Sequence, residues 1–284
     1  MKNLKLAAVC LSCLTMTGCS ALNFSVEGLI NAPKLTSEQS EIHQALIESV
    51  GSNITLKYPK NGEYRSAYVI ANIDDEPTDE AMVFYEYTSN GSEEDGLRVN
   101  ILDKDEDGKW YSVKELAGAG TDIDQVIISP MGSNNQTDVF VGYQNLTNDE
   151  KTMEIYSYTD GDFKRVALDT YSVLEPLDIN NDGYIELITI QRSTNNDTGA
   201  VTAKASMLNM KNNEITRGEN VDMCDNVTSY VSSKTGMLDS GRRAIFIDGL
   251  TADGKLQTEI IYYRYSGLQN PMQLRSEKLL PLCT

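Results

Sequence analysis

The chain has 284 residues, and its 42 acidic and 24 basic side chains give a formal net charge of −18 at pH 7. This balance argues against binding to nucleic acid or to anionic lipid through a basic patch, because both need clustered cations. The whole sequence contains 1 histidine, His43. It lies in a predicted N-terminal helix, so neither a Ser-His-Asp triad nor a histidine-rich zinc site is expected.

Residues 1–18 have the pattern of a secretory signal peptide. Two lysines give a positive start, an apolar run extends from Leu6 to Met16, and the small residues Thr17 and Gly18 precede Cys19. A membrane-spanning helix would need roughly 20 apolar residues, and this run is shorter and carries polar interruptions. The segment resembles the lipobox signal of bacterial lipoproteins.

The lipobox resemblance implies a lipid anchor. In that family the peptidase cuts before the cysteine, here Cys19, whose thiol receives a diacylglycerol and whose freed amine can be acylated too. Two or more acyl chains hold a protein stably at a membrane. The expected location is therefore the cell membrane, lipid-anchored on its extracytoplasmic side. Residues 19–34 have low charge and no sustained periodicity, so we interpret them as a tether.

Residues 35–54 contain the helix that the sequence predicts. Thr36 is a candidate N-cap, and Gln39 follows it at the spacing of a capping box. Apolar residues then recur at helical spacing until Gly51 ends the pattern. The histidine, His43, lies beside this apolar stripe, where a surface or packing role is expected rather than catalysis.

From residue 55 to residue 284 the sequence predicts a β-repeat domain. Short β-rich runs alternate with clusters of Asp, Asn and Gly. The segment 72–81 aligns with 178–187 without a gap, and both place oxygen-bearing side chains before an apolar strand. The identical pairs are Ile73/Ile179 and Glu80/Glu186. Asp138 and Arg243 occupy the same slot as these glutamates in weaker second and fourth copies.

The repeat predicts an all-β fold, a small β-propeller of about four four-stranded blades preceded by the short helix. The four slots are on average about 54 residues apart, close to the length of a four-stranded blade at roughly 40–50 residues. In a closed ring, an early strand such as 68–71 would complete the last blade. The alternative is a β-sandwich of irregular hairpins.

One loop carries residues suited to metal chemistry. Ca²⁺ takes six to eight oxygen ligands, which alternate residues of a tight turn can supply. The candidate ligands are the side chains of Asp178, Asn180, Asp182 and Glu186 and the backbone carbonyl of Tyr184. The loop departs from the EF-hand, because position 12 is Thr189 and the flanks are β-rich.

The loop instead resembles the Asp-x-Asn-x-Asp-Gly-x-x-Asp loops of FG-GAP and VCBS repeats, which occur in integrin-type propellers and bacterial surface proteins. The resemblance is specific for residues 178–187 and partial for 72–81, where Pro77 replaces the glycine. It implies a structural Ca²⁺ at Asp178–Glu186. The alternative is a metal-free Asx-type turn closed by hydrogen bonds. The acidic turn at 103–107 is predicted to be a hairpin only.

Two cysteines, Cys224 and Cys283, remain in the predicted domain after the signal peptide and the lipid site are set aside. Outside the cytoplasm such a pair can form a disulfide. Two unpaired thiols are the equal alternative.

Two functions are consistent with the sequence. The first is a lipid-anchored, non-catalytic module that binds a protein, a glycan or another envelope component, and therefore not an enzyme. The second is an extracytoplasmic hydrolase or lyase that acts on glycans through carboxylates or a metal. No Gly-x-Ser-x-Gly elbow, His-Glu-x-x-His motif or phosphate loop is present in the sequence, so the binding module is the preferred prediction.

Overall fold

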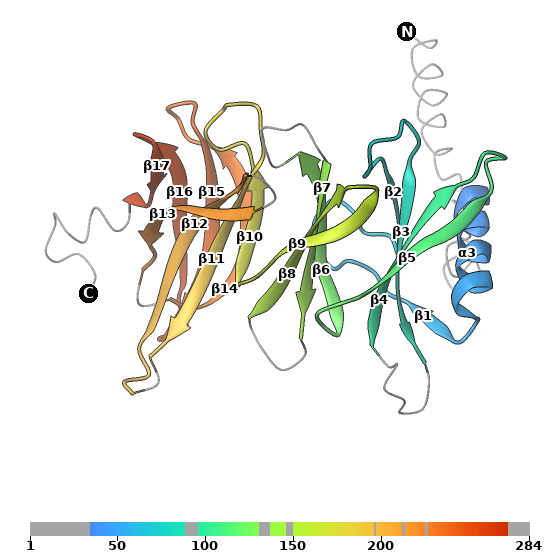
Figure 1. The fold of residues 1–284 in the computed structure, drawn as a ribbon. Coiled ribbons are helices and arrows are strands. Elements are labelled where there is room, and N and C mark those ends of the chain that lie inside the picture. The colour runs from blue at the N-terminus through green and yellow to red at the C-terminus, as the bar shows by residue number, and fades with distance from the viewer. Residues whose placement is uncertain are drawn as a thin grey trace, which may run out of the picture. The chain divides into compact units, whose positions relative to one another are not determined.

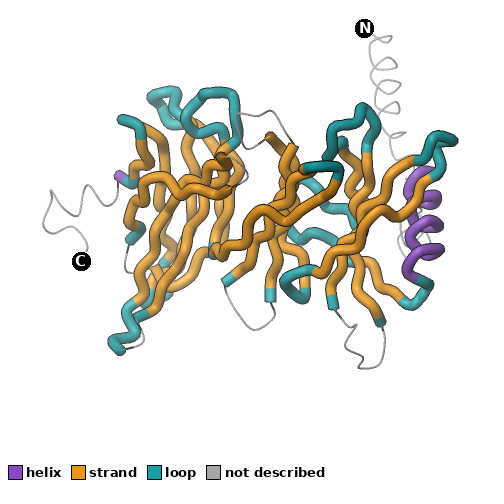
Figure 2. Tube along the Cα trace, viewed as in Figure 1, coloured by secondary structure: helices purple, strands orange, loops and turns teal. Residues whose placement is uncertain are grey.

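The structure is a computed structural model of the chain, and it describes residues 35–88, 96–130, 137–145, 150–195, 197–211, 214–224 and 227–271. Strands dominate these ranges, with a helix near their N-terminal end (Figure 2). The predicted signal peptide, the lipid site Cys19, the tether and Cys283 lie outside the described residues. Within the described ranges, no helix has the length and apolar character that crossing a membrane requires.

The helix α3 (Ser37–Val50) forms as the sequence predicts. Thr36 Oγ1 accepts a hydrogen bond from the backbone N–H of Gln39, and Gln39 Oε1 accepts one from the N–H of Thr36, each at 3.1 Å. This reciprocal pair is a capping box. Gly51 follows the helix with φ of 85°, a left-handed conformation that glycine adopts without strain. The capping prediction is confirmed at both ends.

The strands form four antiparallel sheets (Figure 1). Three are meanders of strands consecutive in the chain. The first sheet contains β1 (Ile54–Leu56), β2 (Tyr68–Ala71), β3 (Glu80–Tyr87), β4 (Leu97–Lys104) and β5 (Trp110–Ala117), and in it β1 and β2 both pair with β3. The second contains β6 (Asp122–Pro130), β7 (Thr137–Gln144), β8 (Lys151–Thr159) and β9 (Asp162–Tyr171). The third contains β10 (Val173–Leu177), β11 (Glu186–Thr194), β12 (Val201–Lys211) and β13 (Glu214–Asp222). The fourth contains β14 (Val227–Met237), β15 (Arg243–Thr251), β16 (Leu256–Arg264) and β17 (Gly267–Gln269).

Neighbouring sheets share hydrophobic clusters, so the core follows the order of the chain. One cluster joins the first sheet to the second, for example Val99 with Val139. Another joins the second to the third through residues such as Phe140, and a third joins the third sheet to the fourth through residues such as Ile190 and Ile245. The apolar face of α3 packs on the first sheet in a cluster that includes Trp110.

The repeat predicted from the sequence appears as an identical contact in two sheets. Glu80 Oε2 accepts the backbone N–H of Ile73 at 2.8 Å, and Glu186 Oε2 accepts that of Ile179 at 3.1 Å. Each glutamate begins the strand that stands second in the order of its sheet, which is β3 in β1-β3-β4-β5 and β11 in β10-β11-β12-β13. The residues of the weaker copies also lie at the start of second strands, since Asp138 is in β7 and Arg243 begins β15. In all four copies the aligned residue therefore lies at or next to the start of a corresponding strand.

The structure confirms the all-β class, the N-terminal helix and the four repeated sheets. It differs from the prediction that an early strand completes the last blade. Residues 68–71 form β2, which pairs with β3 inside the first sheet, and all four strands of the fourth sheet come from β14 to β17. No hydrophobic cluster of the described residues joins the fourth sheet to the first. The closed propeller is not shown by these contacts.

Candidate functional site

The predicted metal loop joins β10 to β11 and is held together by its own side chains. The backbone N–H of Asp182 donates to Asp178 Oδ1 at 3.1 Å and to Asn180 Oδ1 at 2.8 Å. The amide Nδ2 of Asn180 donates to Asp182 Oδ2 at 3.0 Å and to Glu186 Oε1 at 2.8 Å. Four of the five predicted ligands are therefore brought together. For the fifth, Tyr184, the described contact is its N–H donating to Asp182 Oδ1 at 2.9 Å.

The carboxylates of this loop lie close enough together for their charges to affect one another. The pKa of the Glu186 carboxyl is raised to about 7, mainly by burial and to a smaller extent by the charges of Asp182 and Asp178, while the hydrogen bond from the N–H of Ile179 opposes the shift. Arg243 reaches the loop from the fourth sheet, and its guanidinium lies 3.0 Å from Asp178 Oδ2 and donates to the Asp178 carbonyl at 2.8 Å.

The donor set fits a hard cation in kind, because carboxylate and amide oxygens are the ligands that Ca²⁺ prefers. The arrangement is that of a hydrogen-bonded turn, because the Asn180 amide nitrogen, rather than a cation, bridges the carboxylates of Asp182 and Glu186. Among the described residues, no three His, Cys, Asp or Glu side chains are grouped closely enough to hold a metal ion. Calcium binding at this loop remains a prediction.

The predicted disulfide cannot be located, because Cys283 lies outside the described residues. Cys224 follows β13, and its backbone N–H donates to the buried carboxylate of Glu259 at 2.9 Å. The lipid site Cys19 likewise lies outside the described ranges. Both assignments stay predictions.

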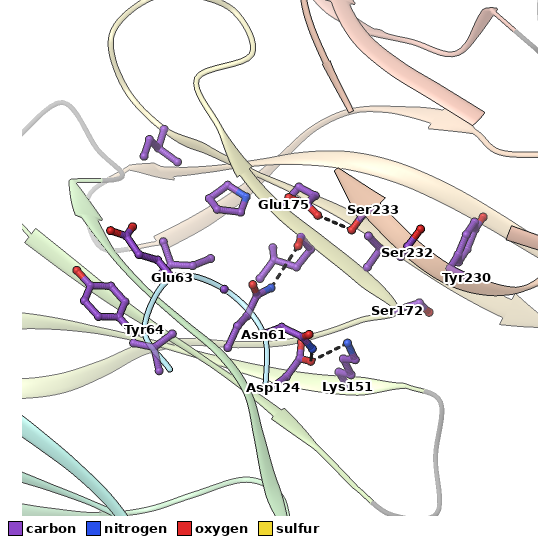
Figure 3. A pocket seen from close by; sticks show the side chains of 18 of the residues that line it. Asn61, Glu63, Tyr64, Asp124, Lys151, Ser172, Glu175, Tyr230, Ser232 and Ser233 are labelled. Atoms are coloured by element: carbon purple, nitrogen blue, oxygen red, sulfur yellow. Dashed lines mark hydrogen bonds and ion pairs between the residues drawn. The ribbon is translucent and has the colours of Figure 1, made fainter. Parts of the chain in front are cut away.

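The structure contains a cavity of about 650 Å³ that the sequence did not predict (Figure 3). Its walls come from β6, β10 and β14, which are the first strands of three successive sheets, and from the segment 61–64 that precedes β2. The second, third and fourth repeats thus contribute the equivalent strand to the cavity, and the first contributes the segment 61–64.

Side-chain hydrogen bonds link the neighbouring walls of this cavity. Asn61 Nδ2 donates to Asp124 Oδ1 on β6 at 2.8 Å. Gln125 Nε2 of β6 donates to the carbonyl of Leu174 on β10 at 3.2 Å. Ser233 of β14 donates its hydroxyl proton to Glu175 Oε1 on β10. These bonds hold three pairs of walls at fixed positions, so the cavity has a defined shape.

Asp124 is the most enclosed charge of the wall, with 1% of its surface exposed. Besides Asn61, it accepts a hydrogen bond from Lys151 Nζ at 2.8 Å and from the Tyr171 hydroxyl at 2.6 Å. The Lys151 ammonium also lies 5.6 Å from the centroid of the Tyr171 ring. With three donors committed to it, this carboxylate is a structural anchor rather than a base open to a ligand.

The remaining acids of the cavity are Glu63 and Glu175. Burial raises the pKa of the Glu175 carboxyl, and the hydrogen bond from Ser233 partly opposes this shift. Burial also raises the pKa of the Tyr64 phenol, with a smaller contribution from the charge of Glu63. Neither glutamate has a cationic partner within the part of the chain that the structure describes.

The cavity brings a serine hydroxyl next to a carboxylate. Its lining contains no histidine, cysteine or arginine among the described residues. Ser233 donates a hydrogen bond to Glu175. An activated nucleophile usually has a base that a third group orients, and no such third group contacts this pair among the described residues. Sequence reasoning missed this site because its residues are spread over four repeats and form no local motif.

No protein-family model matches the sequence, and no curated protein sequence matches it. Among solved structures, the chain is similar to the crystal structure of a "putative exo-beta-1,3-galactanase" from Bifidobacterium bifidum s17. The two share 12% sequence identity, with 77% of this chain and 75% of that chain covered, and the TM-score is 0.28. A likeness at this level establishes neither a shared fold nor a shared activity.

Proposed function

We propose that the chain is a lipoprotein anchored to the cell membrane on its extracytoplasmic side, and that its four-sheet domain is a non-catalytic module that binds a glycan or protein component of the envelope. The observation that carries the binding role is the cavity of about 650 Å³ between the first strands of successive sheets. Cavities of roughly 300–1,000 Å³ with a few convergent polar groups are usual ligand sites.

The finer fold within this proposal is a small four-bladed propeller of the FG-GAP/VCBS kind. Two features support it: the second, third and fourth sheets are consecutive antiparallel meanders, and their first strands line one cavity. In propellers the blades surround a central channel. A structural Ca²⁺ at the loop Asp178–Glu186 is part of the same proposal, supported by the convergence of its side-chain oxygens.

The anchor is supported by the sequence of residues 1–19. The positive start, the short apolar run and the small residues before Cys19 together match a lipoprotein signal. An anchored position outside the cytoplasm is consistent with a domain that offers a binding cavity and has a net negative charge.

The second candidate function is a glycan hydrolase. Glycosidases use two carboxyl groups on opposite sides of the scissile bond, roughly 5–9.5 Å apart. Glu63 and Glu175 both line the cavity from different walls, which favours this alternative. The hydrogen bond from Ser233 occupies one oxygen of Glu175, which favours binding.

The anchor is tested by fractionating bacteria that express the full chain or its Cys19→Ala variant. We expect the wild type in the membrane fraction, labelled by radioactive palmitate, because the diacylglycerol is added to the Cys19 thiol. The variant should lose the label. Equal labelling of the two proteins would contradict the anchor.

The binding role is tested on a glycan array with the detergent-solubilised mature chain. We expect binding that is lost in Ser172→Tyr, which fills the cavity wall, and kept in the matched surface variant Ser193→Tyr. Circular dichroism checks that both variants fold. A parallel assay measures reducing ends released from the bound glycans. Release by the wild type would overturn the non-catalytic role and support the hydrolase.

A further inference from the structure

We propose that the cavity between β6, β10 and β14 binds a small organic cation that carries primary ammonium groups, with Glu63 and Glu175 as its counter-charges. This inference rests on the proposed binding function and names the chemistry of its ligand. The argument comes from the charges of the cavity wall, from their partners and from the hydrogen-bonding capacity that the wall leaves unused.

The charged side chains of the lining are three acids and one base, namely Glu63, Asp124, Glu175 and Lys151. Lys151 and Asp124 neutralise each other, because Nζ and Oδ1 lie 2.8 Å apart and the two side chains are 22% and 2% exposed. When Glu63 and Glu175 are both ionised, the lining therefore has a net charge of two negative units. An anionic ligand would be repelled by this surplus.

Glu175 lies in a place that favours a cation. It is on β10 beside Pro176, which has no backbone N–H to offer, and its described hydrogen-bond donor is the neutral hydroxyl of Ser233. A partly buried carboxylate with one neutral donor is poorly compensated for the water it has lost. A ligand ammonium can supply three further donors together with the opposite charge.

Glu63 stands on a separate wall, on the segment 61–64. Gly62 beside it has φ of 78°, and a Cβ there would lie 3.2 Å from Cβ of Gln125, so this segment turns close against β6. The turn places Glu63 and Tyr64 together on the cavity wall, as Figure 3 shows. An acid beside an aromatic ring can bind a cation by charge and by its attraction to the ring face.

A neutral polyol is a weaker match than a cation. It can donate hydrogen bonds to Glu63 and Glu175, but it brings no opposite charge to the partly buried Glu175 or to the more exposed Glu63 on a different wall. A diamine compensates both. Because the acids stand on different walls, a ligand with two ammonium groups can reach both at once, which gives it an advantage over a monoamine.

The test compares three probes of equal chain length by isothermal titration calorimetry with the mature chain at pH 7. The probes are 1,5-diaminopentane, 1,5-pentanediol and glutarate, which differ in charge. We expect one molecule of the diamine to bind per chain and the other two to show weaker binding or none. Glu63→Gln/Glu175→Gln should weaken the diamine by about tenfold or more, since each lost charged hydrogen bond has this order of effect.

Glu106→Gln is the matched control, because Glu106 is an exposed acid of the β4–β5 turn away from the cavity lining. It should bind the diamine like the wild type, and melting curves show whether each variant is folded. Equal or tighter binding of the diol or glutarate, an equal loss in Glu106→Gln, or no binding of the diamine would each overturn the cation proposal. The proposed binding role would still be supported if the glycan array showed a ligand whose binding is lost in Ser172→Tyr. The binding role and the cation proposal can therefore be contradicted by different results.

Discussion

At the scale of single residues, Asp124 shows how one side chain can join several elements. Its donors come from the segment before β2, from the start of β8 and from the end of β9. Hydrogen bonds to a charged group are stronger than those between neutral groups. Removing one partner of an enclosed ion pair leaves the other charge without compensation, which is costly.

We predict that Asp124→Asn lowers the free energy of unfolding by about 3 kcal/mol, because Lys151 loses its counter-charge and Tyr171 its charged acceptor. The measurement is urea denaturation. Asp122→Asn is the control two residues away, where the carboxylate pairs with Lys60 at 2.8 Å but is more exposed. Such surface pairs contribute about 0–1 kcal/mol, so equal effects of the two substitutions would contradict the role of Asp124.

Glu80 is a residue whose ionisation should change stability with pH. Burial raises the pKa of its carboxyl from 4.5 to about 7, with smaller contributions from the charges of Asp74 and Asp103. The folded state therefore binds a proton that the unfolded state releases between these values. The resulting stability is fully present below pH 4.5 and is lost as pH rises through 7.

We predict that Glu80→Gln removes part of this pH dependence, because glutamine stays neutral and can still accept the Ile73 N–H. The free energy of unfolding, measured from pH 5 to pH 8 in EDTA, should fall less steeply in the variant by about 1–3 kcal/mol over the range. Glu106→Gln should keep the slope of the wild type. A Glu80→Gln slope identical to the wild type would show that Glu80 does not titrate in this range.

At the scale of elements, the strands that the sequence predicts differ in composition and burial from β10 and β14, which it does not predict. Strands such as β3 and β7 are apolar and almost wholly buried, so their composition identifies them. β10 contains Pro176, and β14 reads Val-Thr-Ser-Tyr-Val-Ser-Ser-Lys-Thr-Gly-Met with most of its residues at least partly exposed. Neither has the apolar pattern of a buried strand.

Two of the missed strands, β10 and β14, line the cavity, together with β6, whose apolar run at 126–129 the sequence does reveal. A strand that faces a polar cavity carries serine, glutamate and other polar residues where a core strand would carry valine or isoleucine. Composition then assigns it to a loop. The polar composition that makes β10 and β14 hard to recognise as strands also makes the cavity hard to predict. The contact between Arg243 and Asp178 could not be predicted because it joins different sheets.

The loop Asp178–Glu186 was found because its pattern is local. We predict that Ca²⁺ raises the melting temperature of the wild type relative to EDTA, since a ligand at 100 times its Kd stabilises by about 2.7 kcal/mol. Asp182→Ala should abolish the shift, because it removes a carboxylate from the centre of the loop. Asp107→Ala, in the acidic turn predicted to be a hairpin only, should keep it. No Ca²⁺-dependent shift in the wild type would rule out a structural calcium site.

At the scale of the whole molecule, shared hydrophobic clusters make each sheet depend on the next. A sheet that lost its neighbour would expose one apolar face, as in other repeat architectures. The described residues from Glu41 onward belong to one compact unit. These contacts predict that a destabilising substitution in the fourth sheet also lowers the stability of the first sheet.

The sequence offers a local probe for this coupling, because it has 1 tryptophan. Trp110 is 3% exposed in the cluster between α3 and the first sheet. Ile261 is 0% exposed in the cluster between the third and fourth sheets. Ile261→Ala should lower the free energy of unfolding by about 2–5 kcal/mol, because it leaves a cavity in a packed core.

We predict that Ile261→Ala moves the thermal transition of Trp110 fluorescence as far as that of far-ultraviolet circular dichroism, by roughly 5–15 °C. Coincident transitions are the signature of cooperative unfolding. Leu256→Ala is the control on the same strand, and its side chain is 63% exposed, so both transitions should stay in place. If the dichroism transition shifted in Ile261→Ala while that of Trp110 did not, the first sheet would unfold independently of the fourth, and the consecutive clusters would not transmit stability along the chain.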